Sequence, residues 1–193
     1  MENKNGNMLF DSLGKLSYLE NLKLQNDVFP CPPSEGKLAS LPQRYKFPSK
    51  LKKLTLSDTL LDWKEMSTLG MLENLEVLKL KDNAFQGERW RPEDGGFRAL
   101  KVLHIGRTEL VFWDASAQHF PRLRNLFLRH CGSLQKLPPG FAEVSSLQLV
   151  DLYCTTKSAA ASAREIREKK LWIQGEQGTR GNEFKLSIYP PDQ

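Results

Sequence analysis

The chain has 193 residues, of which 39% are apolar, and it carries a formal net charge of +5. This composition is ordinary for a folded soluble protein, and no apolar run approaches the roughly 18 residues of a membrane-spanning helix. Acidic residues are interspersed among the basic ones, which favours solubility over nucleic-acid binding as the role of the charge. Three cysteines, an odd number without paired spacing, disfavour a disulfide framework and favour a reducing, cytosolic compartment.

A leucine pattern recurs through most of the sequence. Six segments read L-x-x-L-x-L, or the same pattern with Ile or Val in place of one leucine, and their fourth positions are residues 22, 54, 78, 103, 126 and 150. Successive positions are separated by 32, 24, 25, 23 and 24 residues, and leucine-rich repeats run about 20–29 residues with one short strand in each. The pattern therefore predicts an α/β repeat fold. In this interpretation residues 1–157 form a leucine-rich repeat solenoid, a horseshoe segment with about six short parallel strands.

The first step between repeats is longer than a single repeat allows. Residues 28–48 occupy this step and contain Cys31-Pro-Pro33, Pro42 and Pro48. Proline resists both helix and central strand. We therefore expect residues 28–48 to form an inserted Pro-rich loop rather than a missing repeat.

The residues between the leucines form the candidate binding surface. Side chains alternate between the two faces of a strand, so these residues should point away from the core and line the concave surface of the horseshoe. Lysines predominate on this predicted surface, and arginine and aromatic residues gather near its C-terminal end, as in many binding hot spots. The residues expected to make protein contacts are Lys53, Lys79, Lys81, His104, Phe127, Arg129, Asp151 and Tyr153. The alternative is a solvated face that carries ordinary surface residues.

Three tryptophans fall between the predicted strands, each in a different repeat: Trp63, Trp90 and Trp113. Their spacing is consistent with packing on the convex side of the solenoid or with a shared binding surface. Packing is the favoured interpretation, because large aromatic side chains are most often used to fill a core.

The leucine period stops near residue 158. The alanine-rich stretch Ser158–Lys170 has oppositely charged residues four positions apart, which predicts a helix. A Gly-rich turn over residues 175–181 and an alternating strand at Phe184–Ile188 follow. Because the last repeat of a solenoid must be shielded, we expect residues 158–193 to form a C-terminal cap of helix, turn and strand.

The sequence contains no recognisable motif for catalysis or cofactor binding. The phosphate-binding pattern G-x-x-x-x-G-K-[ST] does not occur. The histidines His104, His119 and His130 are scattered, and no pair of ligands has metal-binding spacing, although His130 stands beside Cys131. We therefore expect a non-enzymatic protein without a metal, a cofactor or a small-molecule substrate.

One repeat carries a family resemblance. Residues Phe120–Phe141 have a cysteine at the strand exit, Cys131, followed by leucines at three-residue steps and a Leu-Pro turn. This arrangement resembles the irregular cytosolic repeats of plant intracellular immune receptors, and it lacks the Gly-x-Ile-Pro pattern of secreted plant repeats. Further stretches are similar to the late-blight resistance proteins of potato and tomato. These are residues 74–85, 94–97, 101–108, 150–156 and 184–191.

The resemblance covers essentially the whole chain and matches the C-terminal leucine-rich repeat region of that family. Family members have a coiled coil and a nucleotide-binding switch before the repeats, so ATP or ADP would bind only in a domain that this chain lacks. The resemblance implies a role in plant defence and the hypersensitive response, and a cytoplasmic location with peripheral membrane association as an option. The implied partners are proteins rather than nucleic acid: a pathogen effector, a host guardee, or the nucleotide-binding domain of the same receptor. The chain would be a fragment or a truncated member of the family.

A second class of function stays open. Leucine-rich repeats also serve as substrate adaptors of ubiquitin ligases, as in F-box proteins. No F-box-like helical segment precedes the repeats, which favours the immune-receptor interpretation. An enzyme is the third interpretation, and it would need a cofactor motif that the sequence does not contain.

Overall fold

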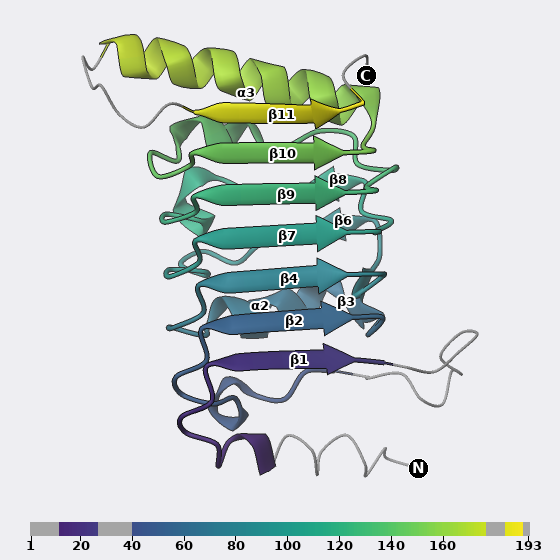
Figure 1. Cartoon of the computed structure of the whole chain (residues 1–193), viewed down its shortest axis with the longest axis vertical. Helices are drawn as coiled ribbons and strands as arrows, with labels where there is room; N and C mark the ends of the chain where they lie inside the picture. The colour runs from purple at the N-terminus through teal and green to yellow at the C-terminus, as the bar shows by residue number, and fades with distance from the viewer. Residues whose placement is uncertain (1–11, 27–39, 177–183, 191–193) are drawn as a thin grey trace.

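The computed structural model describes residues 12–26, 40–176 and 184–190 (Figure 1). Its main feature is a sheet of seven parallel strands in the order β1-β2-β4-β7-β9-β10-β11. Each strand has five residues. They are β1 Asn21–Gln25, β2 Lys53–Ser57, β4 Val77–Lys81, β7 Val102–Gly106, β9 Asn125–Arg129, β10 Leu149–Tyr153 and β11 Lys185–Tyr189. All six strands expected from the leucine pattern are present, and they lie side by side in chain order.

The segments that connect the strands lie behind the sheet in Figure 1. Parallel strands require such crossovers, because the chain must return to the same end before each new strand. Up to β10 the described crossovers contain short elements only. They are η2 Arg44–Lys46, β3 Leu61–Asp62, η3 Trp63–Glu65, α2 Met66–Gly70, β5 Phe85–Gln86, β6 Arg89–Trp90, β8 Phe112–Trp113, η4 Ala117–His119 and η5 Pro139–Glu143.

The strand register places the marker leucines in one column. Leu22, Leu54 and Leu78 pair in turn, and the column continues through Leu103, Leu126, Val150 and Leu186. The members from Leu54 to Val150 are fully buried. The marker leucines predict one buried column, and this prediction is wrong only at Leu22, which is partly buried. Leu22 lies on the first strand of the sheet order, so a neighbouring strand covers it on one side only.

Five consecutive strands end in the same backbone conformation. Asp58, Asp82, Arg107, His130 and Cys154 follow their strands directly, and each has a positive φ between 46° and 55°. In this left-handed conformation the backbone N–H can still hydrogen-bond to the next strand of the sheet. For example, His130 N–H, after β9, donates to the Tyr153 carbonyl of β10 at 2.8 Å. This recurrence of pairing, turn and crossover is compatible with an α/β repeat.

The tryptophans pack in a layer of aromatic rings behind the sheet. Trp63 stacks on Trp90, and Trp90 stacks on Trp113, with ring centroids 5.1 and 5.0 Å apart. All three are at most 4% exposed. Phe120 and Phe141 contact the same layer edge-on. The packing interpretation is therefore confirmed for these tryptophans, and the alternative of a shared binding surface is wrong.

The C-terminal end of the sheet is covered by the helix α3, Lys157–Glu176, and extended by strand β11 (Figure 1). Ala159, Ala163 and Ile166 of α3 are buried, as is Phe184 just before β11. The helix is longer than the sequence indicates, because it continues past Lys170 to Glu176, so the first two residues of the predicted turn, Gly175 and Glu176, are helical. The rest of the predicted Gly-rich turn, residues 177–181, lies outside the described residues, as do residues 28–39 of the predicted Pro-rich insertion.

Candidate protein-binding face

One face of the seven-stranded sheet carries all eight residues that the sequence predicts to make protein contacts. The side chains at the first, third and fifth positions of each strand point to this side, because side chains alternate along a strand. No described helix or strand lies in front of these positions in Figure 1. We call this surface, made of the first, third and fifth residues of the seven strands, the open face. Its predicted members are Lys53, Lys79, Lys81, His104, Phe127, Arg129, Asp151 and Tyr153.

The N-terminal part of the open face is basic. Lys23 on β1, Lys53 on β2, and Lys79 and Lys81 on β4 are exposed or partly exposed. Within the described residues none of these four lysines forms an ion pair. We call this group the lysine half. Its side chains are long and solvated, so its positive charge is available to a partner.

The C-terminal part of the open face is held in one arrangement by contacts among its own side chains. Arg129 Nη2 donates to Asp151 Oδ2 at 2.9 Å, and the guanidinium lies 5.2 Å from the centre of the Tyr153 ring. The two charges compensate each other, so the net positive charge of the face rests on the lysines. We call the group Phe127, Arg129, Asp151, Tyr153 and Tyr189 the aromatic half.

Tyr189 is the member of the aromatic half that sequence analysis missed. Its ring stacks on Tyr153 with centroids 5.0 Å apart and planes 10° apart, and it is 55% exposed. The two residues are register partners on β10 and β11. The sequence holds a signal, because Ile188-Tyr189 repeats the pattern of Leu152-Tyr153. The alternating strand at Phe184–Ile188 predicts a capping role alone, so the sequence does not indicate that its outward residues belong to the face.

His104 lies between the two halves. Burial lowers the pKa of its imidazole, a hydrogen bond to the Leu80 backbone opposes this shift, and the nearby charges of Lys81, Lys79 and Arg129 lower the pKa further. Its ring lies close to Gly106, where an added Cβ would stand 3.4 Å from His104 Cε1. Because the pKa is below the ordinary value, His104 is neutral at pH 7 and adds no charge to the face.

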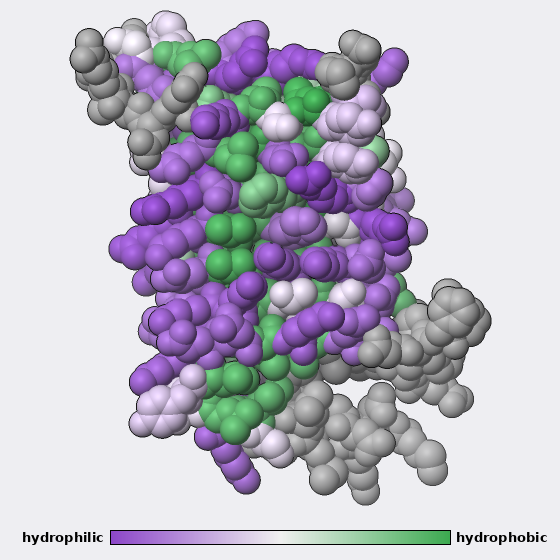
Figure 2. All heavy atoms as spheres, in the orientation of Figure 1, coloured by the Kyte–Doolittle hydropathy of each residue, from purple (hydrophilic) through white to green (hydrophobic). Residues whose placement is uncertain are grey.

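An apolar strip crosses the open face. Figure 2 shows hydrophobic residues in a narrow band across the strands, with hydrophilic residues on both sides. Val77 and Val102 pair at the first strand position, and Leu149 holds the same position on β10. All three are partly exposed, and Phe127 lies in the neighbouring column. A partner on this face would therefore meet an apolar track with charge beside it.

A serine, a histidine and an aspartate come together outside the open face. His119 Nδ1 accepts a hydrogen bond from the backbone N–H of Ser116 at 2.8 Å and lies 3.0 Å from Ser116 Oγ. His119 Nε2 lies 3.1 Å from Asp94 Oδ1. The lone pair of Nδ1 is already used by a backbone amide, and the contact is a capping box at the start of η4. We interpret these residues as a helix cap rather than as a nucleophile and its base.

The cysteine beside His130 is a core residue. Cys131 is 1% exposed, and burial raises the pKa of its thiol to about 12, so the nucleophilic thiolate does not form at neutral pH. His130 points instead to the Tyr153 ring, with centroids 5.2 Å apart. Among the described residues no group of three or more His, Cys, Asp or Glu side chains could hold a metal ion.

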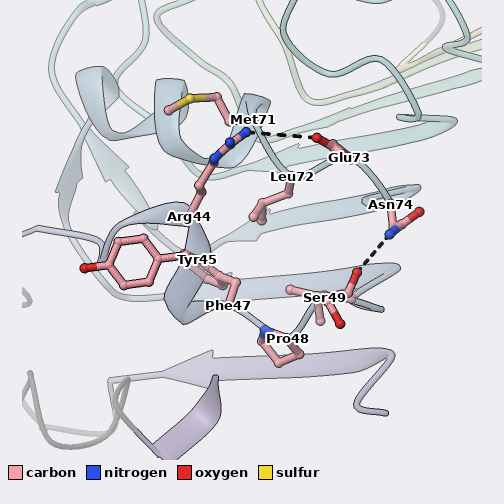
Figure 3. A pocket seen from close by; sticks show the side chains of 10 residues that line it. Arg44, Tyr45, Phe47, Pro48, Ser49, Met71, Leu72, Glu73 and Asn74 are labelled. Carbon is pink, nitrogen blue, oxygen red and sulfur yellow. Dashed lines mark hydrogen bonds and ion pairs between the residues drawn. The ribbon is translucent and has the colours of Figure 1, made fainter. Parts of the chain in front are cut away.

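A cavity of about 350 Å³ lies between two successive crossovers, near η2 and the end of α2 (Figure 3). The Arg44 guanidinium and the Glu73 carboxylate face each other across it at 4.0 Å, and both are largely exposed. Asn74 Nδ2 donates to the Ser49 carbonyl at 2.8 Å. These groups satisfy one another, so the cavity presents no unpaired charge and no nucleophile to a ligand. The open face is the better candidate site.

Fold and site together define a class of protein: a parallel α/β sheet of recurring units that offers a broad surface of mixed charged, aromatic and apolar residues. In residues 12–26, 40–176 and 184–190, no helix combines the length and apolar character needed to span a membrane. No known protein-family profile matches the chain.

Comparison with known proteins finds similarity between this chain and part of several plant resistance proteins. It is 35% identical over 140 residues to the putative late blight resistance protein homolog R1B-13 of Solanum demissum, a match that covers 72% of this chain and 12% of that protein. The homologs R1B-23 and R1B-16 of the same species are 36% and 34% identical, over 72% and 63% of this chain and 11% and 10% of their own lengths. The chain is therefore similar to one part of these late blight resistance protein homologs, and it spans only 10–12% of their length.

Proposed function

We propose that the chain is a non-enzymatic protein-recognition module of a plant disease-resistance protein. In this proposal the parallel sheet is a leucine-rich repeat solenoid, and its open face is the concave surface that binds a protein. The observation that carries the proposal is the two-part composition of the open face, with lysines that form no ion pair among the described residues at one end and a stacked aromatic and arginine group at the other. The relationship to late blight resistance proteins supports the defence role.

The aromatic half has the properties of a binding hot spot. Tyr, Trp and Arg side chains dominate interface energetics where they are packed and held in place. Arg129 is fixed by Asp151 and by the Tyr153 ring, and Tyr153 is fixed by Tyr189. A partner that binds there orders few additional side chains, so less conformational entropy is lost on association.

The proposed partner is either another protein or another part of the same receptor. A pathogen effector or a host protein would bind in trans, and binding of the receptor's own nucleotide-binding domain would hold the switch off. Any ATP or ADP would be bound by that domain and not by these residues. Cys131 and Cys154 are free thiols, which supports a cytoplasmic, reducing location. No feature of the described residues favours the ubiquitin-ligase adaptor over this role.

The proposal is tested in a full-length receptor that contains these repeats, expressed in leaves. One variant combines Lys79→Glu with Lys81→Glu, and a second combines Phe127→Ala with Tyr153→Ala. Each should either lose the cell-death response to the matching pathogen or trigger it without the pathogen. The matched control combines Lys64→Glu with Lys136→Glu, because both lysines are exposed and lie outside the open face. If both face variants respond like the control, the open face is only a solvated surface.

A further inference from the structure

We infer that the open face binds an extended acidic segment of a protein, with acidic side chains over the lysine half and a large aromatic or aliphatic anchor over the aromatic half. This inference rests on the proposed function, because it assumes that the open face is the contact surface. It adds the chemistry of the partner, its direction across the strands and its length.

The charge distribution determines where the acidic side chains bind. Lys23, Lys53, Lys79 and Lys81 carry four positive charges on β1, β2 and β4 without an ion pair in the described residues. At the other end, the single arginine is already neutralised by Asp151 at 2.9 Å, and Lys185 at the start of β11 adds only one cation. Complementary charge speeds association and excludes wrong partners, so the acidic side chains of the partner belong on β2 and β4.

The aromatic half determines where the anchor binds. The stacked rings of Tyr153 and Tyr189 present a flat surface, and Tyr189 is 55% exposed although its neighbour holds it in place. Large apolar side chains gain most when they cover such preorganised aromatic surface. The Arg129–Asp151 pair beside these rings is compensated, so it attracts neither an anionic nor a cationic anchor. The anchor therefore has to be uncharged.

The region between the two halves suits an uncharged linker. His104 is neutral at pH 7 because burial lowers its pKa, and Val77 and Val102 form the apolar strip beside it. Adjacent strands lie about 4.8 Å apart, so the five spacings from β2 to β11 amount to about 24 Å. An extended chain rises about 3.3 Å per residue, so about seven residues of the partner span this distance.

The same features disfavour nucleic acid as the ligand. A single-stranded nucleic acid carries a phosphate at every nucleotide and binds along a continuously basic groove. Here the basic character is concentrated on β1, β2 and β4, whereas towards the other end the Asp151 carboxylate compensates Arg129 and Lys185 on β11 is a single further cation. A protein segment can place its charges at one end only, which matches the observed distribution.

The test selects random peptides of about twelve residues, longer than the span estimated from the strand spacing, on the full chain by phage display. Enriched peptides are then measured against two face variants, Lys79→Glu with Lys81→Glu and Tyr153→Ala with Tyr189→Ala. If the second variant fails to fold, Tyr189→Ala alone replaces it, because this side chain is largely exposed. Matched controls are Lys64→Glu with Lys136→Glu, and Tyr45→Ala in η2, where the tyrosine is 70% exposed.

The expected peptides have acidic residues at one end and an aromatic residue about seven positions away. Each face variant should bind these peptides with an affinity that is lower by about tenfold or more, whereas the control variants should change the affinity by less than about twofold. Neutral or basic peptides that still require the open face would overturn this inference and leave the proposed function standing. Failure to enrich any peptide, or binding that survives both face variants, would count against the proposed function itself. Single-stranded RNA that binds more tightly than the peptides, and depends on Lys79 and Lys81, would overturn the inference in favour of nucleic acid.

Discussion

The two halves of the open face rest on the same sheet but differ in how their side chains are held. In the lysine half the charged groups extend into solvent and contact no acidic residue of the described chain. In the aromatic half Arg129, Asp151, Tyr153 and Tyr189 fix one another through an ion pair, a cation–π contact and a ring stack. Flexible exposed charges mainly affect how fast a partner arrives, whereas preorganised aromatic groups mainly affect how long it stays.

The largest expected effect is on the core that supports both halves. Leu103 is fully buried in the leucine column, so Leu103→Asp would place an unpaired carboxylate there and should lower the free energy of unfolding by about 3–5 kcal/mol. Denaturant unfolding measures the change. The neighbouring residue Val102 points to the open face and is partly exposed, so Val102→Asp should cost far less. Equal losses in the two variants would contradict the assignment of faces.

The next largest effect is on the aromatic half. Tyr153→Ala removes the ring between the Arg129 guanidinium and Tyr189. It should weaken partner binding about tenfold or more, mostly by faster dissociation, because packed aromatic residues carry much of an interface's energy. Surface plasmon resonance with a partner or a selected peptide measures this. Tyr45→Ala is the control, and a similar loss in that variant would show that the effect is not specific to the face.

A smaller effect is expected from a substitution that leaves an unpaired positive charge in the aromatic half, as in the lysine half. Asp151→Asn removes the carboxylate that pairs with Arg129, and both side chains are partly solvent-exposed. Such a pair contributes less than about 1 kcal/mol to stability. The variant should instead make association with an acidic peptide more sensitive to salt, because Arg129 becomes an uncompensated charge. An unchanged salt dependence would mean that the ion pair does not set the charge of this half.

The smallest effect is a pH dependence at the boundary between the halves. The pKa of His104 in the folded protein lies below its ordinary value of 6.5, chiefly because of burial. Below pH 6.5 the unfolded chain therefore takes up a proton more readily than the folded chain, and the free energy of unfolding falls as the pH is lowered. His104→Gln should reduce this fall, which urea titrations at neutral and mildly acidic pH can compare. If the free energy of unfolding changes with pH in the same way in both proteins, His104 is not the source of this pH dependence.

The sheet could be predicted from the sequence because the leucines mark both the period and the buried face. Each strand repeats the same pattern, so a single register aligns Leu54, Leu78, Leu103, Leu126 and Val150. The alternation of side chains then assigns the predicted contact residues to the other face. The leucine-rich repeat solenoid as such is inferred from the leucine period, and the defence role of this surface is inferred from the resemblance, so both are proposals.

The rest of the site depends on geometry that the sequence does not contain. Leu186 follows its register partner Val150 by 36 residues, because α3 intervenes. The regular spacing is lost there, so the sequence predicts a capping role for β11 and no part in the face. The Arg129–Asp151 pair joins the last position of one strand to the third position of the next, so it depends on side-chain rotamers. Sequence analysis identifies both charges but cannot show that they compensate each other.

The division of the open face into two halves is tested most directly by association kinetics at low and high salt. Stopped-flow measurements with a fluorescent selected peptide would compare the wild type, Lys79→Gln with Lys81→Gln, and Tyr153→Ala. The lysine variant should associate more slowly and with a weaker salt dependence while its dissociation rate stays near that of the wild type. Tyr153→Ala should dissociate faster while its association rate and salt dependence stay the same. If both variants change the same rate constant to the same extent, or if neither changes, the two halves do not have separate roles.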